Sequence, residues 1–400
     1  MTELNKSLEY TCIFGGGAAR GTAFAGTAKA LEEMSIFPKT IAGSSVGAIF
    51  AGLMAIGYNA DELKDIFMQV NFELFRDLHF GFGKDFALSK GEIFLEWLRE
   101  LIEQKFYGEN YKKGENPPVT FKDIPKNLII ITTDLTNFKY KEFSKLETPD
   151  FEIAYAIRIS SSMPGLMKPI VIDNQILVDG DLQKSWPAWK LSKNLCPKDE
   201  RVIEFRLEGD YEGQEQNAIN FINTVYSCVT SLSTDFIIET YGQKDKFDFV
   251  KINTGSIVFV DFNLPKEKRQ ALIDVGYEQT FRYFNYTLVG KKQELLKHYR
   301  KISKQIYKIK SYIFANKIKK AQYQLGKLYM DLCKSKRFID LKYYDMIDEF
   351  KDLFLSNISS ASLFGVYSLK NSNLIKSQIK VINLELEKKV IELENYIFKL

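Results

Sequence analysis

Histidine is nearly absent from this chain, with only two copies, His79 and His298, among 400 residues. His298 falls in a lysine-rich helical pattern, which is typical of a solvated helix surface and unfavourable for a catalytic base. The four cysteines are widely spaced without a C-x-x-C pair, and they are Cys12, Cys196, Cys228 and Cys333. They indicate free thiols in a reducing compartment. We expect no disulfide framework, no metal site and no cofactor.

Long apolar runs are also missing. No stretch approaches the 18 consecutive apolar residues that would indicate a membrane span. Residues 1–10 are polar and mixed in charge, unlike a secretory signal. The hydrophobic content of 45% and charged content of 26% are ordinary for a soluble globular chain. We expect a cytoplasmic protein, or an effector delivered without a cleavable signal, that meets a membrane only at its surface.

Proline disappears after Pro265, and the charge changes over the same region. Residues 291–400 hold 21 Lys and 2 Arg against 11 acidic residues, which gives a net charge of +12. The whole chain has a net charge of +4, so residues 1–290 have a net charge of −8. Isoleucines at 302, 306, 309 and 313 predict an amphipathic basic helix. Its basic face could dock on anionic lipid, or its apolar face could pack on the acidic half of the chain. Nucleic-acid binding has no other support, so we expect none.

What the chain does contain is a G-x-S-x-G motif centred on Ser45, with Gly43 and Gly47 at its ends. An apolar segment, 40–42, precedes it, and a helical apolar run, 46–56, follows it. A strand, a sharp turn and a helix form the setting in which a serine hydroxyl is exposed as a nucleophile. The alternative is a helix start of small residues packed on a sheet.

A glycine-rich turn precedes this motif. It consists of Gly15, Gly16, Gly17, Ala18, Ala19, Arg20 and Gly21. Thr22 stands where a phosphate-binding loop needs lysine, and the dinucleotide fingerprint fails by one residue. A turn between a strand and a helix can instead aim backbone N–H groups at a developing oxyanion. We interpret the segment as an oxyanion loop.

Asp179 and Gly180 follow two short apolar strands, 168–172 and 175–178, joined by a hairpin signal. A carboxylate at a strand end can serve as the base for Ser45, although an ordinary Asp-Gly turn is the alternative. Further strands are expected at 128–134, 138–143, 202–207 and 247–252, with helices over 22–34, 151–160 and 217–241. Alternating strands and helices predict a three-layer α/β core.

The three motifs, in this order, resemble the patatin-like phospholipases over residues 8–200, as does the segment 156–164. The resemblance implies a mainly parallel central sheet and a Ser-Asp dyad, with Ser45 as nucleophile and Asp179 as general base. It further implies an oxyanion hole from the amides of Gly16, Gly17 and Ala18. Supporting positions would be Gly15, Arg20, Gly21, Gly43, Gly47 and Gly180.

This sequence departs from the family pattern at two positions. Ala18 stands where glycine is common, and alanine would be strained if φ there is positive. Asp181 stands where the family usually has glycine or alanine. It could raise the pKa of Asp179 if the two carboxylates were close.

We therefore expect a catalytic domain over 1–290 and a helical, lysine-rich region over 291–400. The implied function is hydrolysis of fatty-acyl esters of phospholipids, of phospholipase A or lysophospholipase type, through an acyl-enzyme. Two alternatives are an effector or defence enzyme that needs a protein or nucleotide activator, and a silent scaffold that binds a lipid or partner.

Overall fold

The computed structural model describes residues 10–70, 87–183, 201–209, 247–257, 263–335, 339–361 and 366–399, with the single positions 224 and 228. The chain divides into two compact units. The first comprises residues 1–239 and 246–282, and the second comprises residues 240–245 and 283–400. The helix expected over 217–241 and His79 lie outside the described residues, apart from those two positions.

The first unit is built on one sheet with the strand order β10-β9-β1-β2-β4-β8-β7, and β5 also pairs with β4. The strands are β1 (Tyr10–Phe14), β2 (Pro38–Gly43), β4 (Asn127–Asp134), β5 (Lys139–Ser144), β7 (Ile170–Ile172), β8 (Gln175–Asp179), β9 (Arg201–Glu208) and β10 (Phe247–Asn253). Five neighbouring strands, from β10 to β4, run parallel. Strands β5 and β8 each pair antiparallel with β4, and β7 pairs antiparallel with β8. A short pair, β3 (Ala87–Ser89) and β6 (Gly165–Met167), lies apart from this sheet. The predicted α/β class with a mainly parallel sheet is confirmed.

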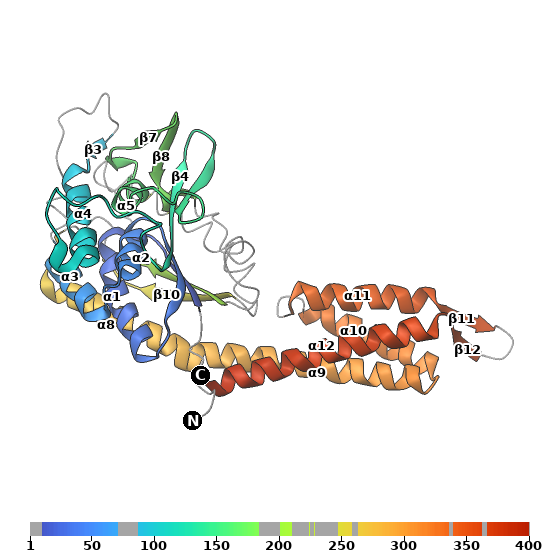
Figure 1. Cartoon of the computed structure of the whole chain (residues 1–400). Coiled ribbons are helices and arrows are strands. Elements are labelled where there is room, and N and C mark those ends of the chain that lie inside the picture. Colours follow the sequence, from blue (N-terminus) through green and yellow to red (C-terminus); the bar gives the residue numbers. More distant parts are fainter. Residues whose placement is uncertain are drawn as a thin grey trace. The chain divides into compact units, whose positions relative to one another are not determined.

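Helices pack around this sheet (Figure 1). They are η1 (Ala18–Thr22), α1 (Ala23–Glu33), α2 (Val46–Ile56), α3 (Ala60–Gln69), α4 (Glu92–Tyr107), η3 (Gly108–Asn110), α5 (Ile153–Ser160), η4 (Gly180–Gln183) and α8 (Lys266–Arg282). The core beside β1 is aromatic. The Phe14 ring lies 5.2 Å from Phe24, 4.8 Å from Phe50 and 5.2 Å from Phe205, measured between ring centroids. Buried aromatic contacts of this kind lock α1 and α2 against the sheet.

Strand β4 pairs with β5 along one edge, over residues 129–134. Its other edge therefore pairs with both β2 and β8. Parallel β2 ends where Gly43 pairs with Ile130. Antiparallel β8 ends where Asp179 pairs with Thr132. The two strands therefore approach from opposite directions, and their carboxyl ends meet beside Ile131. This arrangement brings two segments that are more than 100 residues apart in sequence to one place.

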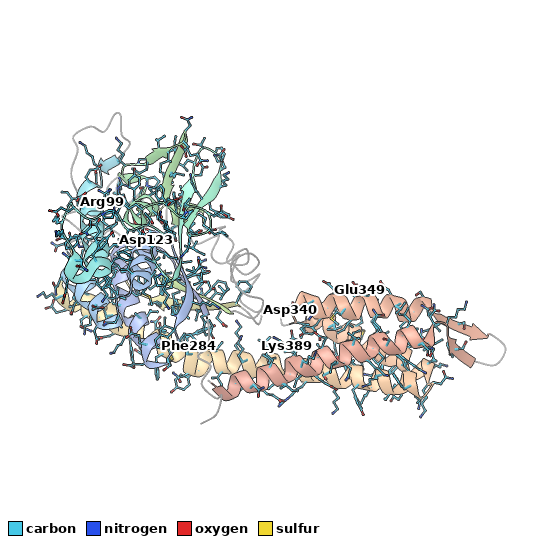
Figure 2. All side chains as sticks on the ribbon, in the orientation of Figure 1. Arg99, Asp123, Phe284, Asp340, Glu349 and Lys389 are labelled. Atoms are coloured by element: carbon cyan, nitrogen blue, oxygen red, sulfur yellow. The ribbon has the colours of Figure 1, made fainter. Side chains whose placement is uncertain are left out.

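The second unit is mainly helical (orange to red in Figure 1). It comprises the π-helical η5 (Tyr283–Leu288), α9 (Val289–Phe314), α10 (Ile318–Ser335), α11 (Leu341–Ser356), the hairpin β11 (Ile358–Ala361) and β12 (Val366–Leu369), and α12 (Ser372–Lys399). Asp340, labelled in Figure 2, caps α11 by accepting from the Lys342 backbone N–H at 3.1 Å. Among the described residues, no helix is both long enough and apolar enough to cross a membrane.

The isoleucine stripe of α9 is the apolar face that the sequence predicts. Ile302, Ile306, Ile309 and Ile313 are all at most 3% exposed and belong to a core shared with α10, α11 and α12. The stripe is thus buried inside the helical unit itself, which supplies the apolar surface that it needs. His298 also lies on α9, where its Nε2 is 3.4 Å from Glu294 and burial lowers its pKa.

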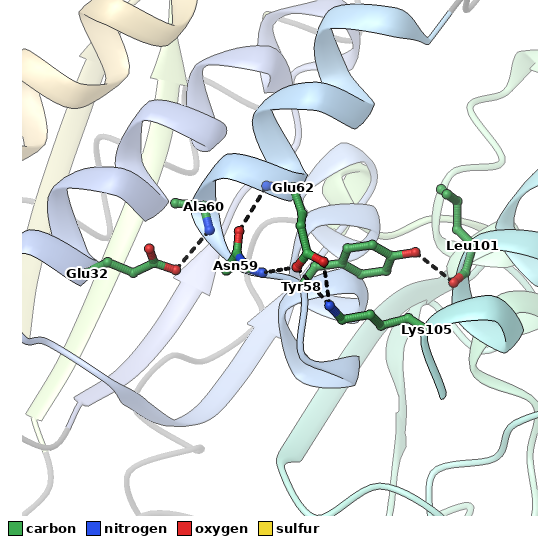
Figure 3. Close-up of polar contacts among 7 residues, drawn as sticks. All are labelled: Glu32, Tyr58, Asn59, Ala60, Glu62, Leu101 and Lys105. Atoms are coloured by element: carbon green, nitrogen blue, oxygen red, sulfur yellow. Dashed lines mark hydrogen bonds and ion pairs between the residues drawn. The ribbon is translucent and has the colours of Figure 1, made fainter. Parts of the chain in front are cut away.

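The start of α3 contains a complete capping box (Figure 3). The Asn59 side chain accepts from the Glu62 N–H at 2.9 Å, and Glu62 Oε2 accepts from the Asn59 N–H at 2.9 Å. Glu62 also pairs with Lys105 of α4 at 2.6 Å, and this hydrogen bond is the largest cause of a lowered Glu62 pKa. One side chain thus joins the α3 cap to α4.

We expect Glu62→Gln to lower the free energy of unfolding by a few tenths to about 1 kcal/mol at neutral pH, because the partly exposed ion pair is lost. A carboxylate with a lowered folded pKa stabilises above its unfolded pKa, and this stabilisation disappears as pH falls through the folded value. Thermal unfolding of both proteins between pH 7 and pH 2 tests this. A difference in Tm that persists at the acidic end would contradict the assignment.

Candidate active site

Ser45 lies at a sharp turn between β2 and α2, with φ 53° and ψ −129°. Positive φ is unfavourable for a residue with a side chain, and such strain concentrates at functional positions. The two flanking glycines allow the turn to close. A Cβ on Gly43 would lie 2.2 Å from the Gly47 carbonyl oxygen, and one on Gly47 would lie 2.0 Å from the Phe14 carbonyl oxygen. The G-x-S-x-G motif therefore forms the strand, turn and helix that the sequence predicts.

The backbone of this turn is held by α5. The Ser45 N–H donates to Ser160 Oγ at 3.0 Å, and Ser160 Oγ donates to the Ile131 carbonyl oxygen at 2.5 Å. Ser161 Oγ donates to the Ser45 carbonyl oxygen at 3.4 Å. Ser160 is fully buried, so its hydroxyl satisfies two buried backbone groups at once. The last turn of α5 thereby ties the elbow to the middle of β4.

Asp179 is the last residue of β8 and is 1% exposed. The predicted hairpin before it is present, with Asp173 and Asn174 at φ 50° and 60° as a type I′ turn requires. The Asp179 N–H donates to the Ser162 carbonyl oxygen at 3.0 Å, and Asp179 Oδ1 accepts from the Asp181 N–H at 2.8 Å. The segment Ser160–Ser162 thus holds the backbone of both Ser45 and Asp179.

Gly180 is needed next to Asp179 because the chain passes close to β4. A Cβ there would lie 2.1 Å from the Ile131 carbonyl oxygen and 3.0 Å from Ser44 Cβ. Any side chain would therefore push the aspartate away from the elbow. The glycine of the Asp-Gly pair is explained by this close approach to the backbone of β4.

The glycine-rich loop leads from β1 into η1. The Gly15 N–H donates to the Phe205 carbonyl oxygen at 3.0 Å, which ties the start of the loop to β9. Buried Arg20 donates from its backbone N–H and its Nε to the Gly17 carbonyl oxygen at 3.1 and 3.4 Å. A Cβ on Gly21 would lie 2.2 Å from Val46 Cγ2, so the loop packs directly on the elbow helix. Ala18 has φ 45°, so the strain anticipated for alanine there is present.

Asp181 links the loop to the elbow. Its Oδ1 accepts from the Gly16 N–H at 3.1 Å and from Ser44 Oγ at 2.5 Å, and the side chain is buried. A Cβ on Gly16 would lie 2.4 Å from Asp181 Oδ2 and 3.0 Å from Ser45 Cβ. The structure thus brings Gly16, Ser44, Ser45 and Asp181 together. The sequence indicated that Asp181 is unusual for the family but not where its side chain points, because the residues of a turn do not determine the direction of a neighbouring side chain.

Arg158 contacts Ser162, which holds Asp179, and the sequence analysis did not identify it. It is 2% exposed on α5, and its Nη1 donates to Ser162 Oγ at 2.6 Å. Its other donors reach the carbonyl oxygens of Lys90, Gly91 and Lys168. One guanidinium thus joins two backbone segments, at residues 90–91 and at Lys168, to the residue that holds Asp179. A basic residue within an apolar helix segment was the only signal in the sequence.

We expect Ser160→Ala to lower the free energy of unfolding by about 1–3 kcal/mol, because two buried backbone groups lose their partner. Ser161→Ala is the matched control, since its single contact with the elbow is longer, and it should cost clearly less. Urea denaturation of the three proteins measures both values. Equal stability of Ser160→Ala and the wild type would show that Ser160 does not hold the elbow.

The sequence is similar to those of known proteins. Residues 12–189 match the family model for patatin-like phospholipase. Uncharacterized protein R571 of Acanthamoeba polyphaga mimivirus is 29% identical over 288 residues, which cover 68% of this chain and 93% of that protein. Probable lipid hydrolase 463L of Invertebrate iridescent virus 6 is 25% identical over 177 residues, covering 44% of this chain and 61% of that protein.

Among solved structures, VipD from Legionella pneumophila superposes with a TM-score of 0.54 at 15% identity, covering 94% of this chain and 90% of that chain. At this identity the likeness concerns the fold alone. The family match spans the glycine-rich loop, the serine elbow and the strand that ends in Asp179. By this match, residues 12–189 form a patatin-like phospholipase domain.

Proposed function

We propose that this protein is a lipid acyl hydrolase, of phospholipase A or lysophospholipase type, that works through a Ser45-Asp179 dyad. The observation that carries the proposal is the shared support of the two residues. Ser45 is strained at a turn whose N–H is held by Ser160, and Asp179 is held two residues away by Ser162. Preorganisation of this kind is what an activated nucleophile and its base require.

In the proposed reaction, Ser45 Oγ attacks the carbonyl carbon of a fatty-acyl ester while its proton passes to Asp179. The tetrahedral intermediate collapses by breaking the ester C–O bond, and Asp179 returns the proton to the departing alkoxide. The acyl group is then bonded to Ser45. Water attacks this acyl-enzyme, Asp179 takes the water proton, and that proton goes to Ser45 Oγ as the fatty acid leaves. Atoms and charges balance without a further reactant.

The developing oxyanion would be stabilised by backbone N–H groups of the loop Gly16, Gly17 and Ala18. The proximity of Gly16 to Ser45 supports this assignment, since a Cβ on Gly16 would lie 3.0 Å from Ser45 Cβ. Removing one such donor typically reduces turnover by about 10²- to 10³-fold. The strained φ of Ala18 is consistent with a loop shaped for such donors.

The second unit would assist by attraction to anionic lipid. Between residues 291 and 320 the chain carries 10 Lys and 1 Arg against one Glu. Lys304, Lys308 and Lys317 are exposed, and so are Tyr307 at 58% and Phe314 at 44%. Each basic residue near an anionic surface contributes about 1 kcal/mol to binding. The proposal also includes a protein or nucleotide activator that would bind this unit and raise the rate of hydrolysis.

Two measurements on the 400-residue chain test the function. A fluorophosphonate should label Ser45, as peptide mapping would show, because the reagent reports an activated serine. Fatty acid should be released faster from vesicles that contain anionic phospholipid than from zwitterionic vesicles. Absence of both labelling and release would favour a silent lipid-binding scaffold. Labelling without release would indicate an active site that awaits an activator.

A further inference from the structure

Asp181 differs in kind from the other residues around Ser45, because it places a carboxylate on the loop assigned to the oxyanion. Its Oδ1 accepts the Gly16 N–H at 3.1 Å and the Ser44 hydroxyl at 2.5 Å. The side chain is 4% exposed, so this contact is made away from bulk solvent. The pairing joins residues that are 165 positions apart in the sequence.

This contact conflicts with a full oxyanion hole. A backbone N–H points along one direction and makes one strong hydrogen bond, so the Gly16 donor serves either Asp181 or the substrate oxygen. The carboxylate also carries negative charge close to Ser45. A Cβ added to Gly16 would lie 2.4 Å from Asp181 Oδ2 and 3.0 Å from Ser45 Cβ, so Gly16 is in contact with both side chains. Like charges at short range in a buried site repel strongly, so the carboxylate opposes the developing oxyanion.

We propose that Asp181 is a built-in restraint on the oxyanion loop. In the resting protein it occupies the Gly16 amide and leaves only Gly17 and Ala18 as donors from the assigned loop. Full stabilisation of the transition state requires Asp181 to release Gly16. This inference rests on the proposed hydrolase function, and it adds that turnover is limited by a residue outside the dyad.

The restraint acts through the side chain alone. The Asp181 backbone N–H donates to Asp179 Oδ1 at 2.8 Å, and this bond is available to any residue except proline at position 181. Asp181→Ala therefore frees Gly16 and Ser44 while it preserves the contact with the proposed base. Asp181→Asn removes the charge but keeps an oxygen that can still accept from Gly16.

Asp123 provides a matched control. Its Oδ2 accepts one backbone N–H and one hydroxyl, both from Thr120, at 2.8 and 2.6 Å. These are the same two kinds of bond that Asp181 makes, but Asp123 is an exposed residue on the loop before β4, whereas Asp181 is buried. Asp123→Ala should change neither turnover nor inhibitor affinity.

The experiment measures kcat and KM on a soluble short-chain ester, and the inhibition constant of an alkyl trifluoromethyl ketone, whose hemiketal oxyanion mimics the intermediate. Regaining one donor should raise kcat of Asp181→Ala by about 10²-fold, with KM little changed. The inhibitor should bind more tightly by a similar factor, with Asp181→Asn between Asp181→Ala and the wild type. A purely structural role would not tighten this inhibitor.

Two outcomes overturn the inference in distinguishable ways. If hydrolysis depends on Ser45 but Asp181→Ala has equal or lower kcat and no tighter inhibition, the restraint is wrong and the hydrolase stands. If neither the wild type nor Asp181→Ala hydrolyses the ester or reacts at Ser45 with a fluorophosphonate, the proposed function fails and the restraint fails with it. Both comparisons require that Asp181→Ala is folded, which circular dichroism would check.

Discussion

Replacing Ser45 with alanine is expected to reduce ester hydrolysis to background, a loss of about 10⁴-fold or more, because the proposed nucleophile is removed. The fold should survive. The Ser45 N–H remains available to Ser160, and alanine carries the same backbone strain as serine at φ 53°. The assay compares initial rates on a soluble ester and on vesicles, with circular dichroism as the check of folding.

A second serine provides the control for this substitution. Ser311 is exposed on α9, and its hydroxyl donates to the Lys308 carbonyl oxygen at 2.8 Å. Ser311→Ala should hydrolyse the ester at the wild-type rate. Hydrolysis retained in Ser45→Ala, with no phosphonate adduct on Ser45 in the wild type, would remove the serine from the mechanism.

Asp179→Asn is expected to lower kcat by about 10²- to 10⁴-fold with little change in KM, because general-base catalysis is lost while substrate contacts remain. The change is nearly isosteric. An amide oxygen can still accept from the Asp181 N–H, and the Asp179 N–H stays bonded to Ser162. A lower kcat with an unchanged KM would therefore indicate the loss of the base, whereas a raised KM would indicate damage to substrate binding.

Asp134→Asn is the matched control for Asp179→Asn. Asp134 is also a fully buried aspartate at the end of a strand, and it accepts from the backbone of Thr136 and Asn137. Hydrogen bonds lower its pKa against the effect of burial, so its replacement should cost stability but not catalysis. Wild-type activity in Asp179→Asn would exclude the dyad, and a strong loss in Asp181→Asn alone would make Asp181 the base.

Local features of the fold were predictable because short-range rules determine them. The serine turn, the hairpin before Asp179 and the helix that follows the glycine-rich loop each depend on residues within one segment. Glycine at 43 and 47, and the pair Asp173 and Asn174, signal tight turns through backbone sterics alone. Periodicity likewise revealed the isoleucine face of α9.

The partners of these segments were not predictable in the same way. Hydrophobic spacing shows that a helix has an apolar face but not what covers it, and the α9 isoleucines pack within their own unit. The support from Ser160 and Ser162 depends on contacts between distant parts of the chain, and so do the bonds from Arg158 to the carbonyl oxygens of three residues. Serine and arginine carry no pattern that specifies such contacts.

The sequence by itself determined the chemical groups and their local turns: a serine at a strand-to-helix turn, a glycine-rich loop and an aspartate at a strand end. Only the tertiary structure decided that β2 and β8 end at one point on β4, and that the Asp181 carboxylate takes the Gly16 N–H. The reason is physical. A turn depends on the dihedral angles of neighbouring residues, whereas strand order and a hydrogen bond across 165 positions depend on how the whole core packs.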